Sequence, residues 1–87
     1  MNKIREVHVV WEVSEELNDK TKEWFDVIEI LIKVGDNVQK QHSLATIENE
    51  KGTGEFSSPL EGEIKEILVK EGGRYHYNDV LCTIEEK

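Results

Sequence analysis

The chain contains one twenty-residue pattern twice, and this repeat limits the folds that it can adopt. Residues 29–48 align without a gap onto residues 66–85, at an offset of 37 (66 − 29), and nine of the twenty positions are identical. Two copies are too few for a stacked solenoid, which needs about three or more repeats. The repeat therefore predicts one domain of two similar halves within residues 1–87. A feature that is present in only one half is a candidate for function.

The composition is that of a globular protein with a strongly hydrated surface. Of the 87 residues, 37% are hydrophobic and 34% are charged. No apolar run approaches the ~20 residues of a membrane-spanning helix, and the first ten residues mix charged with apolar side chains, unlike a signal peptide. Cys82 is the one cysteine, which excludes an internal disulfide and favours a reducing compartment.

The net charge of −8 argues against two classes of partner. Nucleic acids and anionic membranes both require a basic patch, and the eleven lysine and arginine residues are scattered along the chain. We therefore expect no nucleic-acid partner and no membrane partner. The acidity favours solubility, and it can also steer the protein towards basic partner surfaces.

Short β-rich segments dominate the chain. Residues 7–11 are predicted to form the first strand, and residues 25–33 and 63–70 are matched strands of the two halves. The apolar positions of both matched strands leave the two-residue alternation once, at equivalent places. A β-bulge at the same place in each half accounts for this break.

Turns and further strands complete an all-β pattern. Glycine turns follow at residues 35–37 and 72–74, and a second matched pair of strands occupies residues 43–48 and 80–85. Short strands, frequent turns and the lack of crossover helices predict an all-β sandwich or flattened barrel.

Two segments lie outside the matched strands. Residues 57–62 join the halves, with Pro59 and Gly62 as strand breakers. Residues 14–22 have Leu17 as their only apolar anchor. One apolar residue cannot make a buried helical face, so this segment is predicted to be a polar loop.

A lysine turn is present in the first half alone. The segment Asn49-Glu50-Lys51-Gly52 has the composition of a type I turn, and it lies between strand-like residues 44–48 and 53–56. This arrangement predicts a hairpin with Lys51 near its tip, where Gly52 can take a positive φ. The long lysine stem then extends its amine away from the strands.

The surroundings of Lys51 favour an attachment point over a catalytic nucleophile. Glu48, Glu50 and Glu55 flank the lysine in sequence, and acidic neighbours favour the protonated amine. No apolar pocket that would lower its pKa is evident from the sequence. We therefore expect Lys51 to react only when a modifying enzyme removes its proton.

The motifs of the chain, taken together, resemble a known family. They are Gly35-Asp36-Asn37-Val38, Leu44, Ile47-Glu48-Asn49-Glu50-Lys51, Glu55, Ser58-Pro59-Leu60-Glu61-Gly62 and Ile67-Leu68-Val69-Lys70-Glu71-Gly72. In this order and spacing they resemble the lipoyl domain of 2-oxo acid dehydrogenase complexes, over about residues 7–86. The resemblance implies two four-stranded sheets with pseudo-twofold symmetry, a barrel-sandwich hybrid, and it maps the modified lysine onto Lys51.

The resemblance implies a carrier that is not an enzyme by itself. Lipoic acid would be joined to Lys51 as an amide by a lipoate–protein ligase or lipoyl transferase, and it would act as a swinging arm. Its partners would be a thiamine-diphosphate-dependent decarboxylase, an acyltransferase and a dihydrolipoyl dehydrogenase. The domain would be monomeric when isolated, or part of a dihydrolipoyl acyltransferase chain, in the bacterial cytoplasm or the mitochondrial matrix. The protein would supply position and recognition while the cofactor supplies the chemistry.

The resemblance also names residues for recognition by the ligase and the partners. They are Glu48, Glu50, Gly52, Glu55, Glu15 and Glu16. The chain departs from the family at its tip, where Glu50-Lys51-Gly52 replaces Asp-Lys-Ala, and at Gln41 and Asn78, where the family usually has glycine. These departures affect which ligase or partner protein recognises the domain.

Three other functions remain open at this point. A biotin carrier domain of a carboxylase shares the fold, but it has methionine on both sides of its lysine, whereas Met1 is the only methionine here. An unmodified protein-interaction module would not depend on Lys51. A glycine-cleavage carrier is disfavoured because that relative is longer and has additional helical structure.

Other residues are better explained by packing than by chemistry. His8, His42, His76 and Cys82 match no metal-ligand spacing. The aromatic residues are predicted to pack in the core or against turns, and the serines to lie in turns. These aromatic residues and serines are Trp11, Trp24, Phe25, Tyr75, Tyr77, Ser57 and Ser58.

Overall fold

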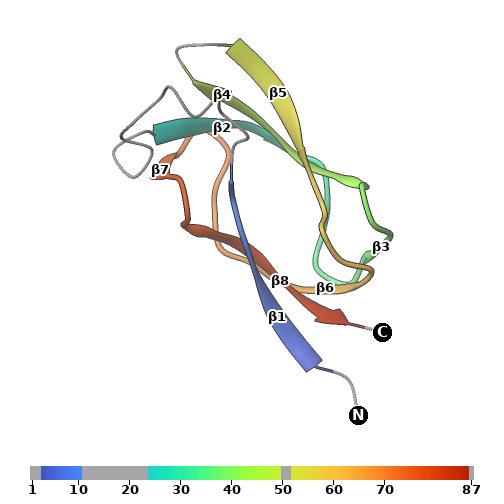
Figure 1. Cartoon of the computed structure of the whole chain (residues 1–87). Coiled ribbons are helices and arrows are strands. Elements are labelled where there is room, and N and C mark those ends of the chain that lie inside the picture. The colour runs from blue at the N-terminus through green and yellow to red at the C-terminus, as the bar shows by residue number, and fades with distance from the viewer. Residues whose placement is uncertain (1–2, 11–23, 50–51, 87) are drawn as a thin grey trace.

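In the part of the chain that the structure describes, eight β-strands form two four-stranded antiparallel sheets (Figure 1). The computed structural model describes residues 3–10, 24–49 and 52–86. The strands are β1 (Lys3–His8), β2 (Trp24–Ile30), β3 (Asn37–Val38), β4 (Ser43–Asn49), β5 (Gly52–Ser57), β6 (Gly62–Ile67), β7 (Arg74–His76) and β8 (Val80–Glu86). Among the described residues, none forms a helix long and apolar enough to span a membrane. The all-β class predicted from the sequence is confirmed.

The two sheets share one strand order, and each takes strands from both halves of the chain. One sheet has the order β1-β8-β6-β3 and the other β5-β4-β2-β7. Each strand of the first half therefore corresponds to the strand four places later, as β4 does to β8. The twofold arrangement expected from the repeat follows directly from this order.

The predicted β-bulges are present at equivalent residues. The pairing of β2 with β4 shifts between Val27 and Glu29, and that of β6 with β8 shifts between Ile64 and Glu66. The extra residues are therefore Ile28 and Lys65, which differ by the offset of the repeat. A bulge increases the local twist of its strand, so both sheets bend at the same position.

The glycine turns after the matched strands are also equivalent. Gly35 and Gly72 have φ values of +97° and +82°, in the region that glycine adopts at little cost. The Gly35 amide donates to the Ile64 carbonyl at 2.8 Å, and the Gly72 amide donates to the Val27 carbonyl at 2.7 Å. Each turn therefore ties one half of the chain to the other.

Gln41 and Asn78 occupy a second equivalent pair of left-handed positions, with φ values of +73° and +82°. The left-handed region costs most L-residues about 1–2 kcal/mol, although asparagine visits it more readily. The backbone N–H of Gln41 donates to the Ser58 carbonyl at 2.8 Å, and this hydrogen bond holds Gln41 in the left-handed conformation. The two sites where glycine was expected from the resemblance are thus the two strained non-glycine positions.

We expect Gln41→Gly to stabilise the domain. Glycine removes the strain of the left-handed backbone, but it also gives the unfolded chain more conformational freedom. Because the first effect is larger, the free energy of unfolding should rise by about 0.5–1 kcal/mol. Urea unfolding followed by circular dichroism measures the change. Asn78→Gly is the matched control and should gain less, because asparagine tolerates this conformation. Equal gains at both positions would contradict this account.

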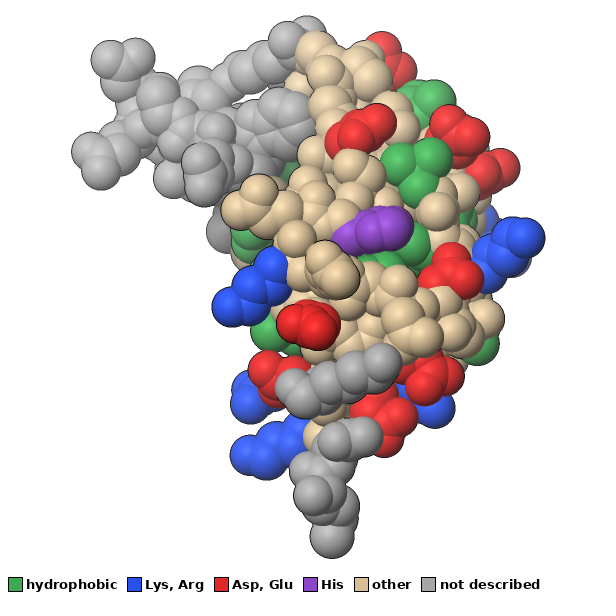
Figure 2. All heavy atoms as spheres, turned by 90° about the vertical axis from the view of Figure 1, so that its right-hand side faces the viewer, with side chains coloured by type: hydrophobic (Ala, Val, Ile, Leu, Met, Phe, Trp, Pro, Cys, Tyr) green, Lys and Arg blue, Asp and Glu red, His purple; other side chains and the backbone are tan. Residues whose placement is uncertain are grey.

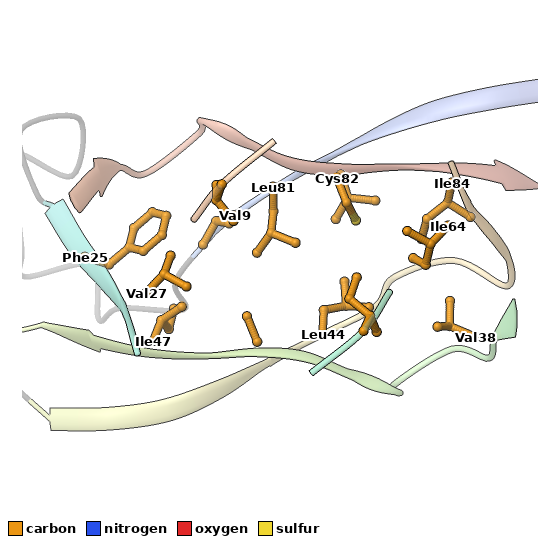
Figure 3. Packing of buried hydrophobic residues seen from close by; sticks show 14 of the residues in the cluster. Val9, Phe25, Val27, Val38, Leu44, Ile47, Ile64, Leu81, Cys82 and Ile84 are labelled. Atoms are coloured by element: carbon orange, nitrogen blue, oxygen red, sulfur yellow. The ribbon is translucent and has the colours of Figure 1, made fainter. Parts of the chain in front are cut away.

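The core lies between the two sheets and is almost entirely aliphatic (Figure 3). Phe25, Val27 and Ile47 fill one end of it, and Val38, Ile64 and Ile84 fill the other. Side chains of this kind contribute about 1.5–3 kcal/mol each when fully buried. The packed core joins the two sheets and holds the strands β4 and β5 in a fixed direction.

Three strand predictions need correction. β1 covers Lys3–His8 instead of residues 7–11, because this edge strand exposes its first four side chains and so lacks an apolar pattern. β2 and β6 end at Ile30 and Ile67, three residues earlier than predicted. There the chain crosses from one sheet to the other, and Ile32 and Val69 stay buried although they belong to no strand.

The other differences concern short segments. β3 and β7 have two and three residues, too few to give an alternating pattern, and the sequence identified only their glycine turns. Gly62 was predicted to be a strand breaker but is the first residue of β6, paired with Glu86. The predicted polar loop at residues 14–22 lies outside the described residues.

Candidate functional site

The strands β4 and β5 form the predicted lysine hairpin. Asn49 at the end of β4 pairs with Gly52 at the start of β5, so two residues, Glu50 and Lys51, separate the paired residues in sequence; both lie outside the described residues. Gly52 has a φ of +148°, positive as expected. The end of β4 and the start of β5 lie at the opposite end of the molecule from the start of β1 and the end of β8 (Figure 1).

The last residues of β4 alternate between the core and the solvent. Ile47 and Asn49 are buried, whereas Glu48 between them is exposed. Glu48 lies opposite Thr53 on one side and Asp26 on the other. The side chain of Glu48 therefore stands on the outer face of the sheet, three residues before Lys51, where a modifying enzyme or partner can reach it.

Aromatic side chains support the inner face of this hairpin. The Asn49 side chain is buried and its Nδ2 donates a hydrogen bond to the Tyr77 Oη at 3.0 Å. The Tyr77 ring packs against Phe25, with 5.0 Å between ring centroids, and Tyr75 lies on the same ring at 6.1 Å. Tyr75 and Tyr77 are therefore packing residues, as the sequence predicted.

The outer face beside Glu48 carries a charged cluster. Arg74 donates through Nε to Asp26 Oδ1 at 2.8 Å and through Nη2 to Oδ2 at 3.3 Å, and its guanidinium lies 3.7 Å from the Trp24 ring centroid. The hydrogen bond from Arg74 lowers the pKa of Asp26 below its ordinary value, against the opposing effect of desolvation. Asp26 therefore stays ionised and paired with Arg74, so Glu48 is the carboxylate of this part of the outer face that is left to meet a partner.

The structure separates the other predicted recognition residues. Glu55 lies opposite Thr46, three pairs away from the Asn49–Gly52 pair, and its Oε1 accepts a hydrogen bond from the Ser43 hydroxyl at 2.6 Å. This bond directs Glu55 along the hairpin towards its base. Glu15 and Glu16, like Glu50, lie outside the described residues.

The acidic side chains are distributed over the surface. On the face shown in Figure 2 they are spread among the other types, and lysine and arginine side chains lie mostly at its edges. This distribution agrees with the net charge of −8. Such a surface attracts basic partners at long range.

The described residues include neither a metal-ligand cluster nor an exposed thiol. None of their histidine, cysteine, aspartate and glutamate side chains gather in a group that could hold a metal ion. Cys82 is fully buried, and desolvation raises the pKa of its thiol to about 11. A buried protonated thiol is a poor nucleophile, so Cys82 is a packing residue of the core.

Sequence reasoning missed two parts of this site. Asn49 was assigned only to the turn, although its place in the alternation, two residues after Ile47, predicts an inward side chain. The contact between Arg74, Asp26 and Trp24 joins β7 to β2. No sequence spacing indicates that contact, because it depends on the pairing of distant strands.

A comparison with protein families identifies one matching family model. The model is described as "Biotin-requiring enzyme", the biotin and lipoyl attachment family, and it matches residues 17–84. This span contains the whole β4–β5 hairpin with Lys51. It covers well over half of the chain.

Curated relatives carry one shared description, the dihydrolipoyllysine-residue acetyltransferase component of the pyruvate dehydrogenase complex. The relative from Haemophilus influenzae is 37% identical and that from Pseudomonas aeruginosa 38% identical, each over 60 residues. A relative from Staphylococcus epidermidis is 33% identical over 60 residues. The aligned part is 69% of this chain and only 11–14% of these relatives. The chain therefore corresponds to a small part of each relative.

Proposed function

Because the chain belongs to the biotin and lipoyl attachment family, we propose that Lys51 carries lipoic acid in amide linkage. The observation that carries the proposal is the two-residue connection between the paired residues Asn49 and Gly52, which contains the lysine. The description of the relatives as dihydrolipoyllysine-residue acetyltransferases supports lipoate as the group attached.

The chain itself would position and present the cofactor. Bound lipoate supplies a disulfide that can accept an acyl group together with two electrons. The rigid sandwich holds the base of the hairpin, while the lysine stem gives the attached group its reach. Tethering keeps the group at a high effective concentration near each partner site. The role proposed for this domain is therefore that of a non-catalytic swinging arm.

The proposed partners are the enzymes that load, acylate and reoxidise the carrier. A lipoate–protein ligase or lipoyl transferase would attach the group. A thiamine-diphosphate-dependent decarboxylase, an acyltransferase and a dihydrolipoyl dehydrogenase would then use it in turn. The exposed Glu48 offers negative charge beside the tip, which suits basic rims around the partners' active sites.

Intact mass measurement tests the attachment. The protein is incubated with lipoate, ATP and a lipoate–protein ligase, and the product is digested for peptide mapping. We expect one lipoyl group per chain, on the peptide that contains Lys51. A parallel reaction with biotin and a biotin ligase distinguishes the biotin carrier. If neither group is attached to the folded protein, the carrier proposal fails and an interaction module takes its place.

We expect Glu48→Ala to slow lipoylation without destabilising the domain. Loss of a charged contact to the ligase lowers kcat/KM on the order of tenfold, while removing a carboxylate opposite Asp26 relieves like-charge repulsion. Glu85→Ala is the matched control, because Glu85 is the repeat equivalent of Glu48 (48 + 37 = 85) in the other sheet. Equal lipoylation rates for the two variants would rule out this role for Glu48.

A further inference from the structure

A buried polar side chain lies directly at the base of the lysine turn. Asn49 is 8% exposed and is the last residue of β4. A buried amide that loses its hydrogen bond costs free energy, so the bond from Asn49 Nδ2 to Tyr77 Oη at 3.0 Å fixes where this side chain can lie. Tyr77 follows β7 in the second half of the chain, so the bond joins the two halves at the hairpin.

The same positions in the other half lack this arrangement. Adding or subtracting the offset of 37 relates Phe25 to Gly62, Tyr75 to Val38, Tyr77 to Lys40 and Asn49 to Glu86. Lys40 is exposed, Gly62 has no side chain, and Glu86 accepts a hydrogen bond from Arg5 on the surface. The backbone of the two halves is otherwise closely equivalent. The aromatic cluster is therefore a feature of the lysine end alone.

We propose that Tyr77 is a positioning residue, whose hydrogen bond to Asn49 sets the direction in which the hairpin presents Lys51 to the modifying enzyme. This inference rests on the proposed lipoylation. Asn49 and Gly52 are the paired residues that flank the turn, and Gly52 lacks a side chain that could restrain it. The restraint comes from Asn49, which the ring of Tyr77 holds from the core side.

The packing of Tyr77 makes this restraint rigid. The ring lies against Phe25 at 5.0 Å between centroids, and Phe25 is fully buried. A tyrosine fixed in this way loses little further freedom when it accepts a hydrogen bond. The Tyr77 hydroxyl therefore holds the side-chain amide of Asn49 in place. A hydrogen-bond partner on an exposed, mobile side chain would not restrain the amide in this way.

Two single-hydroxyl variants separate positioning from general stability. Tyr77→Phe keeps the ring against Phe25 and removes the bond to Asn49. Tyr75→Phe is the matched control, because its hydroxyl accepts a hydrogen bond from the Lys70 amide at 2.9 Å and its ring also packs on Phe25. We expect both to lower Tm to a similar extent. Only Tyr77→Phe should lower the kcat/KM of lipoylation, by about three- to tenfold.

A double-mutant cycle tests the bond itself. We expect Asn49→Ala and Tyr77→Phe to lower the lipoylation rate by similar factors, and the double variant to lose no more than either single variant. Equal lipoylation rates for Tyr77→Phe and Tyr75→Phe, or multiplicative losses in the cycle, would overturn the inference.

A measurement that does not need the cofactor keeps this inference separate from the proposed function. Amide hydrogen exchange at Thr53 and Gly54 reports on the hairpin in the unmodified protein. We expect faster exchange in Tyr77→Phe than in Tyr75→Phe. If wild type is not lipoylated but this difference is present, the proposed function fails while the restraint remains. If the exchange rates are equal, the restraint itself is refuted.

Discussion

Lys51→Arg is expected to abolish lipoylation completely while the β-sandwich remains folded. Arginine keeps the positive charge, but its delocalised guanidinium does not form the amide that a lysine amine forms. The strand pairing next to the turn runs through Asn49 and Gly52, and the core lies below it, so a change within the turn removes no described core contact. Intact mass after the ligase reaction measures the loss.

Lys40→Arg provides the control for this substitution. Lys40 is exposed, and its replacement changes one lysine to arginine without touching the hairpin. The control should be lipoylated at the wild-type rate, and circular dichroism should give the same β spectrum for both variants. A lipoyl group found on Lys51→Arg would place the attachment at another lysine and end the assignment of Lys51.

Gly62→Ala is expected to have the largest effect on stability. A Cβ at this position would collide with the Glu85 carbonyl oxygen and lie 2.7 Å from the Ile84 Cγ2. Both obstacles belong to β8, which occupies the interior of its sheet, so neither can move away freely. Overpacking against a fixed backbone costs about 3 kcal/mol or more, which lowers Tm by roughly 10–20 °C in a domain of this size.

Gly35→Ala separates this collision from simple backbone strain. A Cβ on Gly35 meets nothing within 4 Å, although its φ is +97°, so the variant should lose only the ~1–2 kcal/mol of a left-handed alanine. Thermal unfolding of the two variants under the same conditions makes the comparison. If Gly62→Ala unfolds at the same temperature as Gly35→Ala, the close approach of β6 and β8 is not the constraint that we describe.

The sequence predicted the features that local side-chain patterns determine. The break in alternation at Ile28 and Lys65 identified both bulges, because a bulge moves every later side chain to the opposite face. The bounds of β1 were missed because an edge strand with exposed side chains gives no apolar alternation. Residues 31–33 were assigned to a strand because Ile32 continues the apolar pattern, although the chain has already left the sheet there.

One part of the candidate site was also predictable from the local sequence, and another part was not. A turn sequence with Asn49 and Gly52 as its ends was sufficient to predict the hairpin. The support beneath it was not predictable, because Asn49 and Tyr77 are 28 residues apart and meet only after β2 has paired with both β4 and β7. Local sequence patterns indicate the structure of neighbouring residues, whereas this contact depends on the order in which β4, β2 and β7 lie in the sheet.

Each sheet is built from strands of both halves of the chain, and this has a consequence for how the protein folds during synthesis. β8, the last described strand, pairs with both β1 and β6, and the other sheet needs β7 for its edge. During synthesis, neither sheet can be completed before β7 and β8 have left the ribosome. Pairings between distant segments also form slowly. The repeated halves are therefore not folding units, and acquisition of structure is expected to be a late, single event in which the hairpin is fixed together with everything else.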